Sequence, residues 1–95
     1  MPKVFLFVEI SVKAGKADEF ITHLEKHAVT VRAEDGCEGL DIFKNRENPD
    51  SVCVWEVWRD EAACDVHMEN PTRFAWHKVA SEYVHGEKIT KLKAV

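Results

Sequence analysis

The first part of the chain alternates between two apolar faces at a period of two residues. One face carries only aliphatic side chains, those of Val4, Leu6, Val8, Ile10 and Val12. This spacing predicts a β-strand over residues 4–12. Phe5 and Phe7 stand on the opposite face, so most of the strand is apolar on both sides and must be covered on both. We expect helices to cover one face and the sheet of a second copy of the chain to cover the other.

After a turn at Ala14-Gly15-Lys16, the apolar positions recur at helical spacing. The apolar stripe consists of Phe20, Leu24, Ala28 and Val31, with Ile21 at its margin. It predicts a helix from Ala17 to about Glu34. Gly36 follows at the place where glycine commonly ends a helix.

Two short strands and a turn come next. Cys37–Lys44 alternates apolar and polar residues, and Val52–Trp58 is dense in β-branched and aromatic residues, which favour strands. Asn45–Ser51 lies between them and contains Asn48-Pro49-Asp50, a cluster typical of turns. The two strands are therefore predicted to form a hairpin.

The C-terminal third predicts two helices and a closing strand. Asp60 is a suitable N-cap for a short helix over Glu61–Met68. Proline is favoured at the first helical position, so Pro71 is expected to begin a second helix that runs to Val84. His85 would then stand at the C-terminus of this helix, and Lys88–Val95 would form the last strand. The order β-α-β-β-α-β predicts an α+β fold of the ferredoxin-like type with an antiparallel sheet.

Composition narrows the possible functions. A chain of 95 residues has room for one domain, residues 1–95. Its formal net charge of −4 disfavours a nucleic-acid partner, because phosphate binding needs a basic face. The longest apolar run, Val4–Val8, is too short to span a bilayer, and we expect no signal peptide before it. The three cysteines lack metal-type spacing, so we expect reduced thiols in the cytoplasm.

Four groups of residues form a pattern spread over most of the chain. The first group comprises Val8-Glu9-Ile10, Gly15-Lys16 and Glu19-Phe20. The second group is Arg32–Cys37, which has the pattern R-x-E-x-G-C. The third group is Glu56–His67, which has the pattern E-x-W-x-D-x-x-A-x-x-x-H. The fourth group, Asn70-Pro71 with Phe74, is similar to a T-P-H-F step, from which Thr72-Arg73 departs. This pattern, from about Val4 to Trp76, resembles the antibiotic biosynthesis monooxygenase (ABM) family. The resemblance implies a dimeric α/β barrel built from two back-to-back sheets, and it implies much less about the substrate.

His67 is the first candidate for a catalytic residue. It lies on the short helix after the third strand, and an imidazole is well suited to take a proton near neutral pH. The family's recurrent histidine matches this position. Glu56 sits inside an apolar strand, where a carboxylate is costly unless it is paired. It could orient a histidine, or it could bond a neighbouring strand or helix for structural reasons, which we slightly favour.

His27 is a second candidate, because it lies within the apolar stripe of the first long helix. His23 is one turn earlier, and the pair has the spacing of half a zinc site. No further ligand lies nearby in sequence, so we predict no metal site. We expect His27 to face a pocket and His23 to lie nearer the surface.

Several aromatic side chains and one more histidine could line a pocket for a planar ligand. The candidates for substrate binding are Trp55, Phe74, Trp76 and His77. In a domain this small, at least half of the aromatic residues are expected to serve the core or a dimer interface instead.

The resemblance implies a small oxygenase that acts on an electron-rich aromatic substrate, such as a quinol or phenol, as a homodimer. No dinucleotide or phosphate loop is visible in the sequence, so we expect chemistry without a metal, flavin or other cofactor. In that chemistry His67 would be the base, Glu56 a possible orienting group, and Trp76 or Phe74 a wall of the cavity.

Three alternatives stay open. The chain also resembles ABM-type proteins that process a phosphorylated, sugar-derived quorum signal, and such an isomerase would need Arg32 or Arg73 in its pocket. Heme degradation would use His77 as the iron ligand. The relatives that degrade heme also need an asparagine where this chain has Phe7 and a tryptophan near His67, so this alternative is disfavoured. The third alternative is a small-molecule binding module without catalysis.

Overall fold

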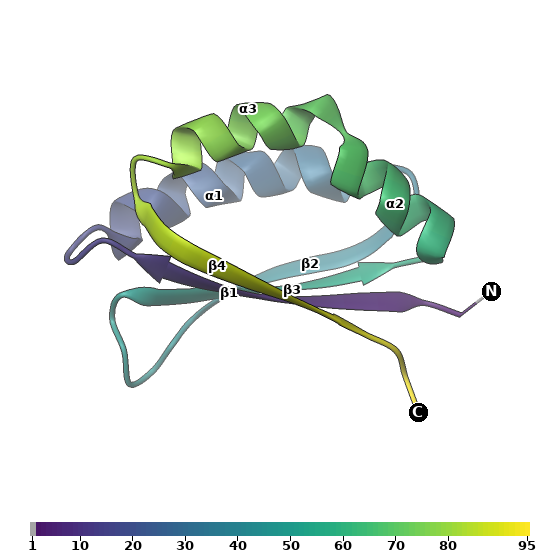
Figure 1. Ribbon diagram of the computed structural model, residues 1–95, viewed down its shortest axis with the longest axis horizontal. Helices are drawn as coiled ribbons and strands as arrows, with labels where there is room; N and C mark the ends of the chain where they lie inside the picture. Colours follow the sequence, from purple (N-terminus) through teal and green to yellow (C-terminus); the bar gives the residue numbers. More distant parts are fainter. Residues whose placement is uncertain (1) are drawn as a thin grey trace.

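The computed structural model describes residues 2–95 as a four-stranded sheet with helices against one face (Figure 1). The elements are β1 (Val4–Val12), α1 (Ala17–Arg32), β2 (Cys37–Lys44), β3 (Ser51–Trp58), α2 (Glu61–Glu69), α3 (Pro71–Ala80) and β4 (Val84–Leu92). All paired strands are antiparallel, and their order across the sheet is β2-β3-β1-β4. The predicted ferredoxin-like fold is therefore confirmed.

The helix-covered face of the sheet holds the core. Alternation along β1 turns its five aliphatic residues toward the helices, and all five are buried. In β3 the same alternation buries Val52, Val54, Glu56 and Trp58. The stripe of α1 packs onto these residues, and Phe20 and Ala28 are almost completely inaccessible to solvent. Each residue of this core withdraws apolar surface from water, which is the main driving force of folding.

Two tight local structures bring the loop after α1 against α2. Gly36 has a φ of 87°, a conformation that glycine adopts without strain. A Cβ atom at this position would lie only 2.4 Å from the Cβ atom of Ala63. The side chain of Asp60 caps α2 by accepting a hydrogen bond from the Ala63 nitrogen at 2.9 Å. The loop and α2 can therefore approach closely only because residue 36 has no side chain.

The boundary between α3 and β4 differs from the prediction. The helix ends at Ala80 and not at Val84, and β4 begins at Val84. Val84 pairs with Val12, and the Lys13 nitrogen donates to the Tyr83 carbonyl at 2.7 Å. Pairing with the end of β1 thus extends the strand backwards, and His85 lies in β4 and not at a helix C-terminus.

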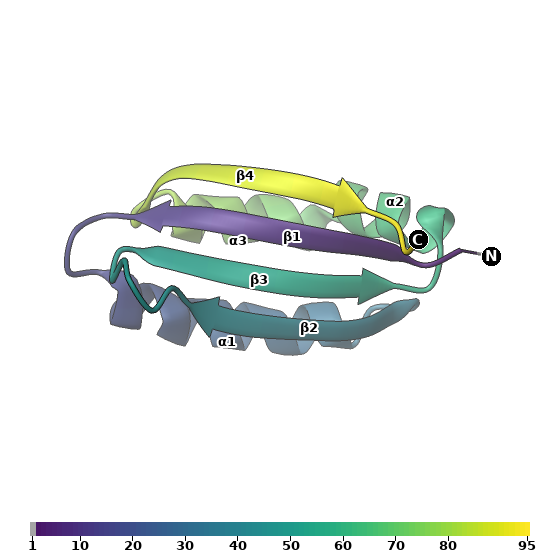
Figure 2. The ribbon, with the colours of Figure 1, turned by 90° about the horizontal axis from the view of Figure 1, so that it is seen from below.

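The other face of the sheet carries no helix. Figure 2 shows the four strands from this side, with the helices behind them. Trp55 lies against two phenylalanines of β1, with ring centres 5.6 Å from Phe5 and 6.3 Å from Phe7. Phe43 and Leu92, which lie on the same face of the outer strands, are 51% and 42% exposed. No helix within residues 2–95 is long and apolar enough to cross a membrane.

Candidate active site

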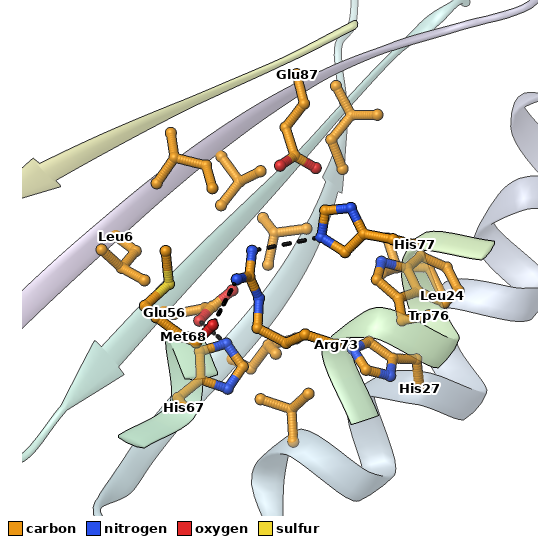
Figure 3. Close-up of a pocket in the computed structure, with 16 residues that line it drawn as sticks. Leu6, Leu24, His27, Glu56, His67, Met68, Arg73, Trp76, His77 and Glu87 are labelled. Carbon is orange, nitrogen blue, oxygen red and sulfur yellow. Dashed lines mark hydrogen bonds and ion pairs between the residues drawn. The ribbon is translucent and has the colours of Figure 1, made fainter. Parts of the chain in front are cut away.

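A cavity of about 60 Å³ lies between the sheet and the helices (Figure 3). Aliphatic side chains of β1, β2, β3 and α1 form much of its wall. Its polar lining consists of His27, Glu56, His67, Arg73, His77 and Glu87. A largely apolar cavity with a few converging polar groups is the usual form of a small-molecule site.

The ring of His67 is held by two neighbours, Trp58 and Glu34. It lies in α2 with only 5% of its surface exposed. Its ring stacks on Trp58, with centres 4.4 Å apart. Its Nδ1 atom is 3.0 and 3.1 Å from the two carboxylate oxygens of Glu34, which belongs to the loop between α1 and β2. A carboxylate accepts and does not donate, so this contact places a proton on Nδ1 and leaves Nε2 directed at the cavity.

Glu56 stands next to Nε2 of His67. Its Oε1 atom accepts a hydrogen bond from Nε1 of Trp58 at 3.0 Å and lies 3.6 Å from Nε2. The second distance is too long for a hydrogen bond. Burial raises the pKa of the Glu56 carboxyl above its usual value, although the bond from Trp58 and the nearby charges of His67 and Arg73 act in the opposite direction. Glu56 is therefore a carboxyl group that holds a proton more readily than an exposed glutamate does.

His27 approaches the cavity from α1 in different surroundings. Its ring stacks on Trp76 with centres 4.7 Å apart and planes inclined by 5°. The pKa of His27 is lowered to about 4, first by burial and then by the positive charges of His67, Arg73 and His77. The imidazole of His27 is therefore uncharged at neutral pH.

Arg73 extends from α3 into the cavity, as Figure 3 shows. Its Nη1 atom donates to the carbonyl of Met68 at 2.9 Å, and its Nη2 atom lies 3.4 Å from Nε2 of His77. Arg32, the other arginine considered for a phosphate, instead donates from Nε and Nη2 to the Leu40 carbonyl at 3.1 and 2.9 Å. Arg32 thus joins α1 to β2, and only Arg73 reaches the cavity.

The structure brings together most of the residues singled out from the sequence. Those that line the cavity are His27, Glu56, His67, Trp76 and His77. The placement of Trp55 in the pocket was wrong, because alternation along β3 gives the inner face to Glu56 and turns Trp55 to the open face. The placement of Phe74 was wrong as well: it is 71% exposed, because α3 directs Arg73, Trp76 and His77 to the cavity.

His23 is not part of the cavity lining and lies next to Tyr83, in the turn between α3 and β4. Its Nε2 atom is 3.2 Å from the hydroxyl of Tyr83, and it is half-buried. Across residues 2–95, no group of three histidine, cysteine or acidic side chains is placed to hold a metal ion.

Two acidic residues of the site were not foreseen. Glu34 is the hydrogen-bond partner of His67, and Glu87 enters the lining from β4. Glu34 is the glutamate of the R-x-E-x-G-C segment, so that segment did contain a signal for it. Glu87 faces the cavity because it pairs with Ile10, whose side chain points to the helices.

Solved structures with the same fold cover the whole chain. PA3566 of Pseudomonas aeruginosa superimposes with a TM-score of 0.89 at 23% identity, covering 100% of this chain and 96% of the other. SnoaB of Streptomyces nogalater, a cofactor-independent oxygenase, gives a TM-score of 0.88 at 16% identity over 99% of this chain and 94% of its own. Identities this low establish the fold alone.

Two proteins are more similar in sequence. YcnE of Bacillus subtilis, a candidate monooxygenase, is 32% identical over 66 residues, which are 70% of each chain. The uncharacterized protein sll1783 of Synechocystis is 34% identical over 62 residues, 65% of this chain but only 42% of its own length. The family model described as antibiotic biosynthesis monooxygenase matches residues 4–79. The chain therefore belongs to the antibiotic biosynthesis monooxygenase family.

Proposed function

We propose that this protein is a cofactor-independent monooxygenase that oxidises an electron-rich aromatic molecule, such as a quinol or phenol, with His67 as the base. The observation that carries the proposal is the geometry of His67. Its Nδ1 atom is bound by Glu34 at 3.0 Å, and its Nε2 atom faces the cavity next to Glu56. A buried imidazole with one nitrogen fixed by a carboxylate has the arrangement of a general base.

In the proposed reaction, His67 acts as the base, Glu34 supports it, and His27 with Trp76 holds the substrate ring. Nε2 of His67 takes a phenolic proton, and the Glu34 carboxylate stabilises the imidazolium that forms. The substrate anion gives one electron to dioxygen, and the resulting substrate radical and superoxide combine in a C–O bond. Protonation and loss of water then leave one oxygen atom of dioxygen as a new carbonyl, so that a CH₂ group and O₂ become C=O and H₂O. His27 and Trp76, stacked on each other, would form a flat wall beside the ring.

Oxygen consumption tests this function. Purified protein is given a panel of quinols and anthrone-type phenols, and oxygen uptake is followed together with transfer of ¹⁸O from ¹⁸O₂ into the product. We expect uptake with at least one substrate, one labelled atom per product, and loss of both in His67→Gln. Glu47→Gln, at an exposed position in the turn between β2 and β3, should behave as the wild type. The absence of uptake across the panel would remove the main support for the proposal.

A second function is favoured by one specific observation, the position of Arg73 in the cavity. A phosphorylated sugar derivative could place its phosphate on Arg73, while His67 and Glu56 move a proton on the carbon next to a carbonyl. The expected result is turnover of a phosphosugar by the wild type and its loss in an Arg73→Ala variant that stays folded. Tight binding of several classes of ligand without any turnover would instead indicate a binding module.

We also propose that two copies pair through the open faces of their sheets. Phe5, Phe7 and Trp55 form an apolar cluster there, and exposed apolar patches of this kind mark interaction sites. Trp55→Glu should shift sedimentation from dimer to monomer, whereas Val66→Glu, on an exposed position of α2, should not. A wild-type protein that sediments as a stable monomer at micromolar concentration would contradict the dimer.

A further inference from the structure

The guanidinium of Arg73 has no acidic partner in the part of the chain that the structure describes. Arginine keeps its charge at any physiological pH, and Arg73 is half-buried, so part of its hydration is lost without a paired carboxylate. The ion pairs of residues 2–95, counted to 4.0 Å, do not include Arg73. Its two close contacts, the Met68 carbonyl and Nε2 of His77, are both uncharged acceptors. The guanidinium thus has hydrogen-bond partners and acts on the Glu56 carboxyl from beyond 4.0 Å, but no acidic group is in contact with it.

The acidic residues of the cavity are engaged elsewhere or lie at its rim. Oε1 of Glu56 accepts from Trp58 and lies beside His67. Glu87 is exposed at the β4 edge, where water screens its charge. On the side of α1 and α3, the permanent charge of Arg73 adds to burial in lowering the pKa of His27. This side of the cavity disfavours cations and therefore favours an anion.

There is also space for a substituent next to His77, the residue that Arg73 contacts. A second hollow of about 220 Å³ lies between α3 and the start of β4. It shares Trp76, His77 and Glu87 with the cavity, so the two spaces adjoin at the residue that Arg73 contacts. A ring beside His67 could therefore direct a charged group toward α3 without leaving the pocket.

We propose that Arg73, with His77, binds an anionic substituent of the substrate, a carboxylate or a phosphate, and that this charge determines which molecules the site accepts. The inference rests on the proposed function only in using the same cavity, and it holds for either reaction. Arginine can bind both oxygens of such a group at once, which a lysine cannot do. His77 lies one helical turn from Arg73 and is the natural second donor.

Pairs of probes that differ only in charge test this inference. Gentisate and gentisamide have nearly the same shape, but only the first carries a carboxylate. Dihydroxyacetone phosphate and dihydroxyacetone are the corresponding pair for a phosphate. Binding of all four to the wild type, Arg73→Gln, Arg73→Lys and the exposed control Arg46→Gln is measured by calorimetry and NMR. Oxygen uptake is not the readout, so a failure of the proposed reaction would not be mistaken for a failure of this site.

We expect the anionic member of at least one pair to bind the wild type and Arg46→Gln about tenfold more tightly or better, because a hydrogen bond to a charged group is stronger than one between neutral groups. The preference should vanish in Arg73→Gln and weaken in Arg73→Lys. The pair that shows it distinguishes a carboxylate from a phosphate substrate. Equal binding within both pairs, or a preference that survives in Arg73→Gln, would overturn the inference.

A measurement on the wild type alone guards against misfolded variants. NMR titration of His27 is repeated with and without the anionic probe that binds. A bound anion offsets the positive charge of Arg73, so the pKa of His27 should rise from about 4. An unchanged pKa at saturation would show that the anion binds away from Arg73 and would contradict the proposal.

Discussion

Two histidines face one cavity from different helices, and their electrical surroundings are opposite. His67 is bound to the Glu34 carboxylate at 3.0 Å and has Glu56 at 3.6 Å. His27 lies flat on Trp76, and its pKa is lowered first by burial and then by nearby positive charge. His67 is buried and His27 is half-buried, so both rings lose contact with water to some degree and burial alone does not decide what a histidine can do. What distinguishes His67 is the Glu34 carboxylate in contact with its ring.

The comparison separates the roles that the sequence had assigned jointly. Protonated His27 is far more acidic than an ordinary imidazolium, because its pKa is about 4, so it cannot hold a proton taken from a phenol at neutral pH. His67 has a carboxylate to stabilise its charged form. We therefore propose His67 as the base and His27 as part of the cavity wall, although both were candidates for catalysis.

The largest expected effect comes from removing the two imidazoles in turn. His67→Gln should lower kcat/KM by at least about 100-fold, the lower end of what a general base contributes. His27→Gln should lower it by less than about tenfold, because only packing against Trp76 is lost. Steady-state kinetics on both variants, with circular dichroism as a check of folding, give the answer. Equal losses would remove the distinction between the two histidines.

A smaller effect is expected from the partner of the base. Glu34→Gln keeps the size of the side chain and removes the carboxylate that fixes Nδ1, and loss of such a partner typically costs about 10–100-fold. The loss should fall on kcat with KM nearly unchanged, because Glu34 does not line the cavity. Glu47→Gln, in the exposed turn between β2 and β3, serves as the matched control. A rise in KM alone would assign Glu34 to substrate binding.

The pH dependence of stability should also reveal His27. Its folded-state pKa is about 4 and its ordinary value is 6.5, so the unfolded chain binds the extra proton between these values. Stability should fall as the pH is lowered from 6.5 to 4, with a slope below about 1.4 kcal/mol per pH unit and further reduced because the ring is half-exposed. Urea denaturation of the wild type and His27→Gln measures it: the variant should show the shallower fall.

Glu56 should give a smaller effect with the opposite sign. Burial raises its pKa from 4.5, so the folded state binds more protons above pH 4.5, and this residue destabilises the protein as the pH rises through that window. As the pH rises from about 4.5 to the folded-state pKa, the free energy of unfolding of the wild type should therefore fall relative to that of Glu56→Gln. A difference that does not change with pH would show that Glu56 is fully charged in the folded protein.

The spacing of apolar residues along the chain predicted the features that are set by local sequence, namely the strands and which of their side chains face the helices. The alternation in β1 and β3 predicts the strands and the inward position of Glu56, and the same alternation places the neighbouring Trp55 on the outward face. It could not give the pair of Glu34 and His67, which are 33 positions apart and meet because Gly36 permits a close approach to α2.

The α3 region was predicted least well, for a related reason. None of its residues is fully buried, so the hydrophobic pattern does not mark which side faces the cavity, and the outward position of Phe74 and the inward position of Arg73 were missed. Pairing of Val84 with Val12, a contact between distant segments, fixed the end of the helix.

The position of one proton tests the central claim most directly. Long-range ¹H–¹⁵N correlation spectra of the wild type, with His67 assigned by comparison with His67→Gln, report which ring nitrogen is protonated at neutral pH. The geometry predicts a proton on Nδ1, toward Glu34, and an unprotonated Nε2 facing the cavity. A neutral ring with its proton on Nε2 would leave no free base on the cavity side and would contradict the account.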